Sequence, residues 1–144
     1  MAAVLDTNVL VYAHREEMPE HSAAVALLRS LSTGPEPVGL PWPCVYEFLR
    51  VVTHARVFGI PSRLSDAWAF VGDLIAMPSM LLLAETERHA DVLAEILVDA
   101  APAGNLVHDA HIAALALEHG FSEVITNDRD FRRFPRLTMR LLGP

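Results

Sequence analysis

Short apolar runs alternate along this chain with longer segments of helical periodicity, and this alternation limits the folds open to it more than any other feature. Each run is too short for a helix and has the character of a fully buried strand. Buried strands separated by helices are typical of a parallel sheet with helices on both faces. The sequence therefore predicts an α/β protein. Because no stretch has the composition of a linker, we expect a single domain over residues 1–144.

The boundaries of the elements follow from periodicity, Gly and Pro breaks, and capping residues. Strands are expected at residues 2–5, 38–40, 80–84, 124–126 and 138–142. Helices are expected at residues 8–14, about 21–31, about 43–52, 65–77, 87–100 and 107–119, with a short turn or helix at 128–134. Thr7 and Ser65 are expected to cap the first and the fourth of these helices.

Charge excludes several classes of function. The chain has no Lys, and its 11 basic residues are all Arg, which excludes a P-loop nucleotide site and a Schiff-base enzyme. A net charge of −7 argues against a protein that binds nucleic acid by bulk charge alone. Two divalent cations would offset four of these charges, so a nucleic-acid substrate is still compatible with the composition.

Cysteine use and hydropathy predict where the protein resides. The single cysteine, Cys44, cannot form an intramolecular disulfide, which fits a reducing compartment. We expect no leader segment and no membrane span, and therefore a cytoplasmic protein. Apolar residues are more frequent than in an average soluble domain, so part of the surface is expected to contact a second copy or another protein.

Four acidic residues are placed where they can converge. Asp6 closes the first predicted strand, Asp128 follows the fourth, Asp109 lies in the first turn of a helix, and Glu47 lies on the helix after the second strand. In open parallel sheets the functional crevice lies beyond the carboxyl ends of the strands, where the strand order reverses. Four carboxylates there would repel one another without a cation, and oxygen ligands alone favour Mg²⁺ or Mn²⁺ over zinc.

Each acid also has a purely structural interpretation. Asp6 and Asp128 suit turns or caps, and Asp109 suits the dipole of a first helical turn. Glu47 is harder to explain in this way, because it is a lone acid in an otherwise apolar helix and the burial of a lone Glu is costly. The set of four is much more specific than any one of its members.

Four motifs occur together in an order and spacing that characterise one family. They are Asp6-Thr7-Asn8 after the first strand, Glu47 in Glu-Phe-Leu-Arg-Val, His108-Asp109-Ala110 at the start of an apolar helix, and Thr126-Asn127-Asp128-Arg129-Asp130-Phe131 after a strand. With these motifs the chain resembles, over essentially its whole length, the PIN domain, and specifically the VapC-type toxins of toxin-antitoxin modules.

The resemblance implies a three-layer α/β/α sandwich around a mostly parallel sheet of four to five strands. It implies a homodimeric ribonuclease that uses one or two Mg²⁺ or Mn²⁺ ions, leaves 5′-phosphate and 3′-hydroxyl ends on RNA, and is inhibited by a VapB-type antitoxin. Asp6, Glu47, Asp109 and Asp128 then correspond to the acidic quartet that binds the metal and carries out catalysis. Asp130 matches a fifth acidic position that either binds the metal or only orders the loop.

Basic residues near the acids have competing interpretations. Arg129, Arg132 and Arg133 are candidates for contacts with RNA phosphates, against a solvated surface or an antitoxin contact. His108 and His111 do not share the helical face of the acid between them, so both are expected at the surface or in a dimer contact.

Two other interpretations of the chain, and the place of one aromatic residue, remain to be weighed. An aspartate-nucleophile phosphatase needs a second Asp two positions after the first and also a Lys, whereas this chain has Asn8 and no Lys. Tyr46, beside Glu47, is expected to pack in the core rather than to stack on a base. A non-catalytic PIN module that binds RNA or a protein partner is the alternative to the ribonuclease.

Overall fold

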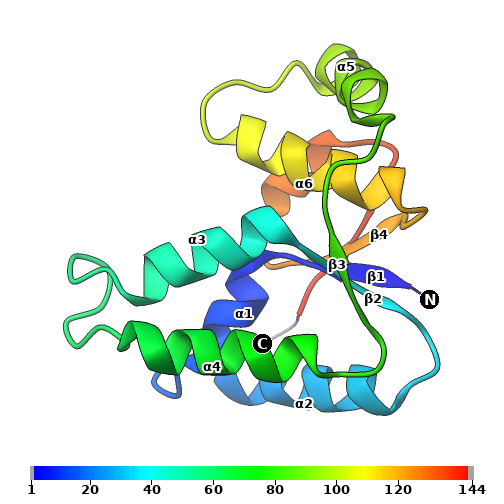
Figure 1. Cartoon of the computed structure of the whole chain (residues 1–144). Coiled ribbons are helices and arrows are strands. Elements are labelled where there is room, and N and C mark those ends of the chain that lie inside the picture. The colour runs from blue at the N-terminus through cyan, green and yellow to red at the C-terminus, as the bar shows by residue number, and fades with distance from the viewer. Residues whose placement is uncertain (1, 143–144) are drawn as a thin grey trace.

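A five-stranded parallel sheet forms the centre of the protein, whose structure is a computed structural model that describes residues 2–142 (Figure 1). The strands are β1 (Ala3–Leu5), β2 (Val38–Pro41), β3 (Met80–Leu83), β4 (Glu123–Ile125) and β5 (Thr138–Arg140). Their order across the sheet is β3-β2-β1-β4-β5, and every neighbouring pair is parallel. All five predicted strands form, and the α/β class is confirmed.

Helices cover both faces of this sheet. They are α1 (Thr7–His14), α2 (His21–Thr33), α3 (Trp42–Val52), α4 (Leu64–Ile75), α5 (His89–Ala100) and α6 (Leu106–Glu118), followed by the 3₁₀ helix η1 (Arg129–Arg133). In Figure 1, α5 and α6 lie on one side of the strands, and α2 and α4 lie on the other. The protein therefore has the three layers that the resemblance implies. Within residues 2–142, no helix has the length and apolar character needed to cross a membrane.

The strand order reverses beside β1, the central strand. From β1 the chain moves outward through β2 and β3, and it then returns to place β4 on the other side of β1. Val4 is in register with Gly39 of β2 and with Val124 of β4. The carboxyl ends of β1 and β4 thus meet at the point where parallel sheets bind ligands.

Close packing around β2 depends on a glycine. A Cβ atom at Gly39 would lie 2.6 Å from Val4 Cγ1, 2.9 Å from Leu83 Cδ1 and 3.3 Å from Phe121 Cε2. Side chains from both neighbouring strands therefore occupy the space above this residue. Gly39 allows β1, β2 and β3 to share one tightly filled core.

Two predicted helix caps are wrong. Thr7 is the first residue of α1, and the cap is Asp6, whose Oδ1 accepts a hydrogen bond from the Thr7 backbone N–H at 2.8 Å. Helix α4 begins at Leu64, so Ser65 lies inside the first turn, and Arg63 at the cap position provides no side-chain hydrogen bond. In the first case the backbone of Asp6 is extended, as is usual for a cap, and its carboxylate takes the role expected for the Thr7 hydroxyl.

Candidate active site

Asp6 lies at the end of β1 and is held there by three donors. Its Oδ1 accepts from the Thr7 N–H, and its Oδ2 accepts from Thr126 Oγ1 at 2.7 Å and from Asn8 Nδ2 at 3.1 Å. Thr126 directly follows β4, so the pairing of β1 with β4 brings its hydroxyl to the carboxylate. The Asp6 side chain is therefore fixed by groups from both strands at the reversal of the sheet.

Burial raises the free energy of the ionised Asp6 carboxylate. Asp6 is only 6 % exposed. Desolvation raises its pKa from 3.8 to about 6, against the opposing effect of the hydrogen bonds from Thr126 and Thr7, and the charges of Glu47 and Asp128 add to the rise. A positive charge in this position would relieve the penalty.

Asp109, Asp128 and Asp130 form the tightest group of carboxylates at the site. Each offers one oxygen, and these oxygens all lie within 4.8 Å of one another. Asp109 projects from the first turn of α6, while Asp128 caps η1 through a hydrogen bond of 2.9 Å from the Asp130 N–H to its Oδ1. Asp130, the fifth acid predicted from the sequence, therefore belongs to the same close group as Asp109 and Asp128 of the quartet.

Asp109 also has a strongly perturbed pKa. It is 8 % exposed, and desolvation, followed by the charges of Asp6 and Asp128, raises its pKa from 3.8 to about 7. A residue that served only the dipole of α6 would gain nothing from such surroundings. The charge of His108 lowers the pKa of Asp109 but only partly offsets burial and the neighbouring acids.

Glu47 has a partner that sequence reasoning missed. Glu47 Oε2 lies 2.6 Å from His108 Nε2, and this contact lowers the pKa of Glu47 and raises that of His108. The expectation that His108 has only a surface or dimer role is wrong. His108 does lie off the face of its neighbour Asp109, as helical geometry requires, but α3 places Glu47 on the His108 side of α6.

Two adjoining cavities connect these residues. The larger is a cleft of about 710 Å³, whose lining residues are Pro43, Tyr46, Glu47, Arg50, Asn105, His108, Asp109, Asp128 and Asp130. The second has a volume of about 280 Å³. It is lined by all four members of the predicted quartet, Asp6, Glu47, Asp109 and Asp128. Apolar side chains of α1, of α3 and of the loop after α3 also line it. Four segments far apart in the sequence thus present their acids to one space.

The cleft has basic and aromatic residues that differ from those expected. Arg50 lines it one helical turn after Glu47, a spacing that places both on one face of α3 and that the sequence already contains. Tyr46 also lines it and is 69 % exposed, so the expected core position of Tyr46 is wrong.

The predicted arginine group lies outside the cleft. Arg129, Arg132 and Arg133 are exposed on η1, and none of them is among the residues that line the cleft. The guanidinium of Arg133 donates to the Ala100 carbonyl oxygen at 3.2 Å. Their contact with RNA stays a prediction.

The donor set fits a hard divalent cation. The acids that share the two cavities offer only carboxylate oxygens, which suit Mg²⁺ and Mn²⁺. Burial raises the pKa of Asp6 and of Asp109, so a cation beside them would stabilise their ionised forms. Both observations fit a site that could hold a cation.

Comparison with known proteins gives one family. Residues 3–137 match the PIN domain family. The chain is 43 % identical over 136 residues to ribonuclease VapC43 of Mycobacterium tuberculosis, covering 94 % of this chain and 92 % of that protein. It is 38 % identical over 131 residues to ribonuclease VapC37 of the same organism, covering 91 % and 90 %.

Solved structures share the fold. VapBC2 from Rickettsia felis, bound to a DNA fragment from its promoter, matches with a TM-score of 0.71 at 17 % identity, over 98 % of each chain. VapC20 of Mycobacterium tuberculosis, a toxin that cleaves the sarcin-ricin loop, matches with a TM-score of 0.67 at 17 % identity, over 92 % of this chain and 93 % of that one. At such identities the likeness shows the architecture of the sheet and its helices alone.

Proposed function

Because the chain belongs to the PIN-domain family, we propose that it is a metal-dependent endoribonuclease and the toxin of a VapBC-type toxin-antitoxin module. One observation carries the proposal: Asp6, Glu47, Asp109 and Asp128 come from four separate segments and line one cavity. Relatives that match over more than nine tenths of the chain are ribonucleases, which supports RNA as the substrate class.

Asp6, Asp109 and Asp128 would hold one or two Mg²⁺ or Mn²⁺ ions, with Glu47 beside them. Asp130 is a further candidate ligand, because its carboxylate belongs to the same close group as Asp109 and Asp128. When bound, such an ion supplies the positive charge that activates water and offsets the charge that develops on the phosphate.

Glu47 is suited to orient the attacking water. Its low pKa keeps it ionised at neutral pH, so it can accept a hydrogen bond from that water at the wall shared by the two cavities. The water oxygen bonds to phosphorus while the bond from phosphorus to the 3′ oxygen breaks. The two water protons end on the products, which carry a 5′-phosphate and a 3′-hydroxyl group.

Arg50 and His108 provide the cationic side of the cleft. Both line it, and the raised pKa of His108 favours its protonated form. A planar guanidinium and an imidazolium are suited to bind phosphate oxygens. These two residues are therefore our candidates for positioning the RNA backbone.

The protein partners follow from the same family. We propose a homodimer and inhibition by a VapB-type antitoxin in the cytoplasm, supported by VapBC complexes among the structures with this fold. Large apolar side chains are exposed in the loop before α4 and on its first turns, namely Val57, Ile60, Leu64 and Trp68. Association with a second copy or an antitoxin would remove such a surface from water.

The substitution Asp109→Asn tests the proposed site. In metal-free protein, the loss of one repelling charge should leave stability equal or raise it modestly. With Mg²⁺ or Mn²⁺ the wild-type protein should gain about 2.7 kcal/mol at a hundredfold excess over Kd, and the variant should lose most of that gain along with RNA cleavage. Thermal melts with chelator and with metal, and one cleavage assay on total RNA, measure both effects.

Asp66→Asn is the matched control, because Asp66 is an exposed acid in the first turn of α4. It should change neither metal stabilisation nor cleavage. If Asp109→Asn lowers stability equally with and without metal and keeps activity, Asp109 is only a helix-terminus residue. If the wild-type protein binds the metal but cleaves no RNA, the non-catalytic module is the better interpretation.

A further inference from the structure

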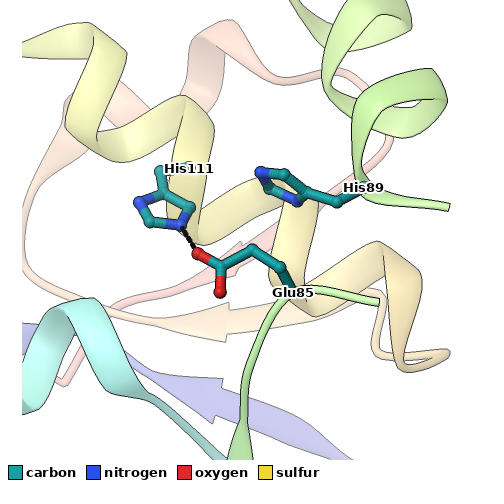
Figure 2. Close-up of side chains that lie close together, drawn as sticks. All are labelled: Glu85, His89 and His111. Atoms are coloured by element: carbon teal, nitrogen blue, oxygen red, sulfur yellow. Dashed lines mark hydrogen bonds and ion pairs between the residues drawn. The ribbon is translucent and has the colours of Figure 1, made fainter. Parts of the chain in front are cut away.

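A second cluster of metal-binding side chains lies where the connection after β3 meets α5 and α6. Glu85 is in that connection, His89 is the first residue of α5, and His111 is in the middle of α6. Figure 2 shows the two imidazole rings and the carboxylate facing one another across a small space. One ligand atom from each of the three lies within 4.8 Å of the others, and His111 Nε2 lies 2.7 Å from Glu85 Oε1.

A buried carboxylate orients one of these ligands. His89 Nδ1 lies 2.6 Å from Glu118 Oε2, and the Glu118 side chain is 0 % exposed. Glu118 Oε1 in turn accepts from the Thr86 N–H at 2.9 Å and from Thr86 Oγ1 at 2.7 Å. A carboxylate on one ring nitrogen fixes the tautomer and leaves the other nitrogen as a ligand, which is the arrangement around histidines that bind metals.

We propose that Glu85, His89 and His111 form a zinc site that is separate from the carboxylate site. Two imidazole nitrogens and one carboxylate oxygen are a ligand set for Zn²⁺ and related first-row ions, whereas Mg²⁺ prefers oxygen alone. Three protein ligands leave one position of a tetrahedral shell for water. The ion would replace the direct contact between Glu85 and His111.

A surface ion pair alone does not account for this cluster. Such a pair would explain the contact of Glu85 with His111, but it would not require His89 to face the same space. Glu118 is buried and holds His89 in that orientation through a second, independent contact. The cluster therefore has both a ligand set and a support for it.

The two sites share α6 but lie on different faces of it. His111 is two positions after Asp109, and residues two apart on a helix point in different directions. A cation at Glu85, His89 and His111 would join the β3 to α5 connection, α5 and α6, and would stabilise the packing of α5 on α6. Binding of an ion at this second site would therefore raise the free energy of unfolding independently of the carboxylate site.

Zinc titration of the full chain in excess Mg²⁺ tests the proposal, because Mg²⁺ should occupy the carboxylate site if the proposed function is right. Calorimetry should show one Zn²⁺ per wild-type chain. His89→Ala and His111→Gln should each weaken binding by at least tenfold, and Glu85→Gln, at an exposed position, should do so with little effect on folding. His54→Ala, which removes an exposed histidine outside the cluster, should bind Zn²⁺ as the wild type does.

Two further measurements separate this site from the carboxylates. Asp6→Asn should keep the Zn²⁺ site, and Co²⁺ in place of Zn²⁺ should give the visible absorption of a tetrahedral ion with histidine ligands in wild type but not in His89→Ala. Zinc binding that survives all three cluster substitutions, that is lost in Asp6→Asn, or that does not occur in wild-type protein would overturn the proposal.

Discussion

Asp6 and Asp109 are carboxylates held where water reaches them poorly, and both gain protons more readily in the folded chain than in the unfolded one. Asp6 is held by three hydrogen-bond donors, whereas the first turn of α6 places Asp109 beside other acids that repel its charge. At the scale of the single residue, ionisation of these two acids is unfavourable in the folded chain, and either protonation or a bound cation would relieve it.

Metal-free protein should therefore lose stability as the pH rises. The folded-state pKa values of about 6 and about 7 lie above the ordinary 3.8, so the stabilising contribution of the protonated acids is complete below about pH 4 and is lost as the pH rises through 6 and 7. We expect a loss on the order of 3 kcal/mol between pH 5 and pH 8. Urea unfolding with chelator measures it.

The substitution Asp109→Asn removes one of the two titrating groups, so it should reduce this loss of stability and leave the part that Asp6 contributes, while Asp66→Asn should not change it. Saturating Mg²⁺ should reduce the loss in the wild-type protein as well. A loss of stability that is undiminished in the Asp109→Asn variant would place its origin in other groups.

Arg50 should contribute to RNA binding more than the arginines of η1 do. In an Asp6→Asn background that cannot cut, Arg50→Ala should reduce the salt dependence of binding to single-stranded RNA by about 0.7 per lost phosphate contact. Arg132→Ala with Arg133→Ala serves as the comparison, because both residues lie outside the cleft. A reduced slope in the double variant alone would instead place the RNA over η1.

The acids of the site could be predicted from sequence because their positions follow from topology. Asp6 and Asp128 follow strands, and parallel strands bring their carboxyl ends together. The partnership of His108 with Glu47 could not be predicted, since it depends on how α3 crosses α6. Arg50 could have been found, because it lies one turn after Glu47 on the same helix.

At the scale of the element, the packing of β2 against its neighbours leaves no room for a side chain at Gly39. Val4 from β1 and Leu83 from β3 both fill that space, so the three strands are packed through one position without a side chain. The strands themselves were predictable from their short apolar runs. The caps of α1 and α4 were not, because a shift of only one or two residues in where a helix begins changes which residue is the cap.

Gly39→Ala should destabilise the protein by about 1 to 3 kcal/mol, because the added methyl group has no room without movement of the neighbouring side chains. Gly72→Ala in α4 is the matched control. A Cβ there meets nothing within 4 Å, so this change should stabilise the helix by about 0.5 to 1 kcal/mol. Chemical denaturation of both variants gives the comparison, and equal effects would contradict the close packing at β2.

At the scale of the whole molecule, a net charge of −7 is compatible with a function on RNA, because a bound cation would offset the charge of the acids that line the proposed site. The attraction between the protein and the RNA phosphate backbone would then depend on the bound ion and on a few local cations such as Arg50. Exposed apolar side chains around α4 leave the isolated chain with a surface that association would cover.

Expression of the chain without its antitoxin should arrest growth, since an intact acidic quartet implies cleavage of an essential RNA. Asp6→Asn, produced at the same level, should allow normal growth. Coexpression of the VapB-type antitoxin should restore growth to cells that produce the wild-type chain. Unimpaired growth of cells that contain folded, metal-loaded wild-type protein would count against the toxin assignment.

The hydrogen bond from Thr126 to Asp6 joins residues 120 positions apart, because β4 pairs with β1 although β2, β3 and several helices lie between them in the sequence. Asp6 and its partners at the site are therefore made far apart in the chain. A chain truncated before β4 lacks Asp128 and the Thr126 hydroxyl that holds Asp6, so we expect it to lack the complete site.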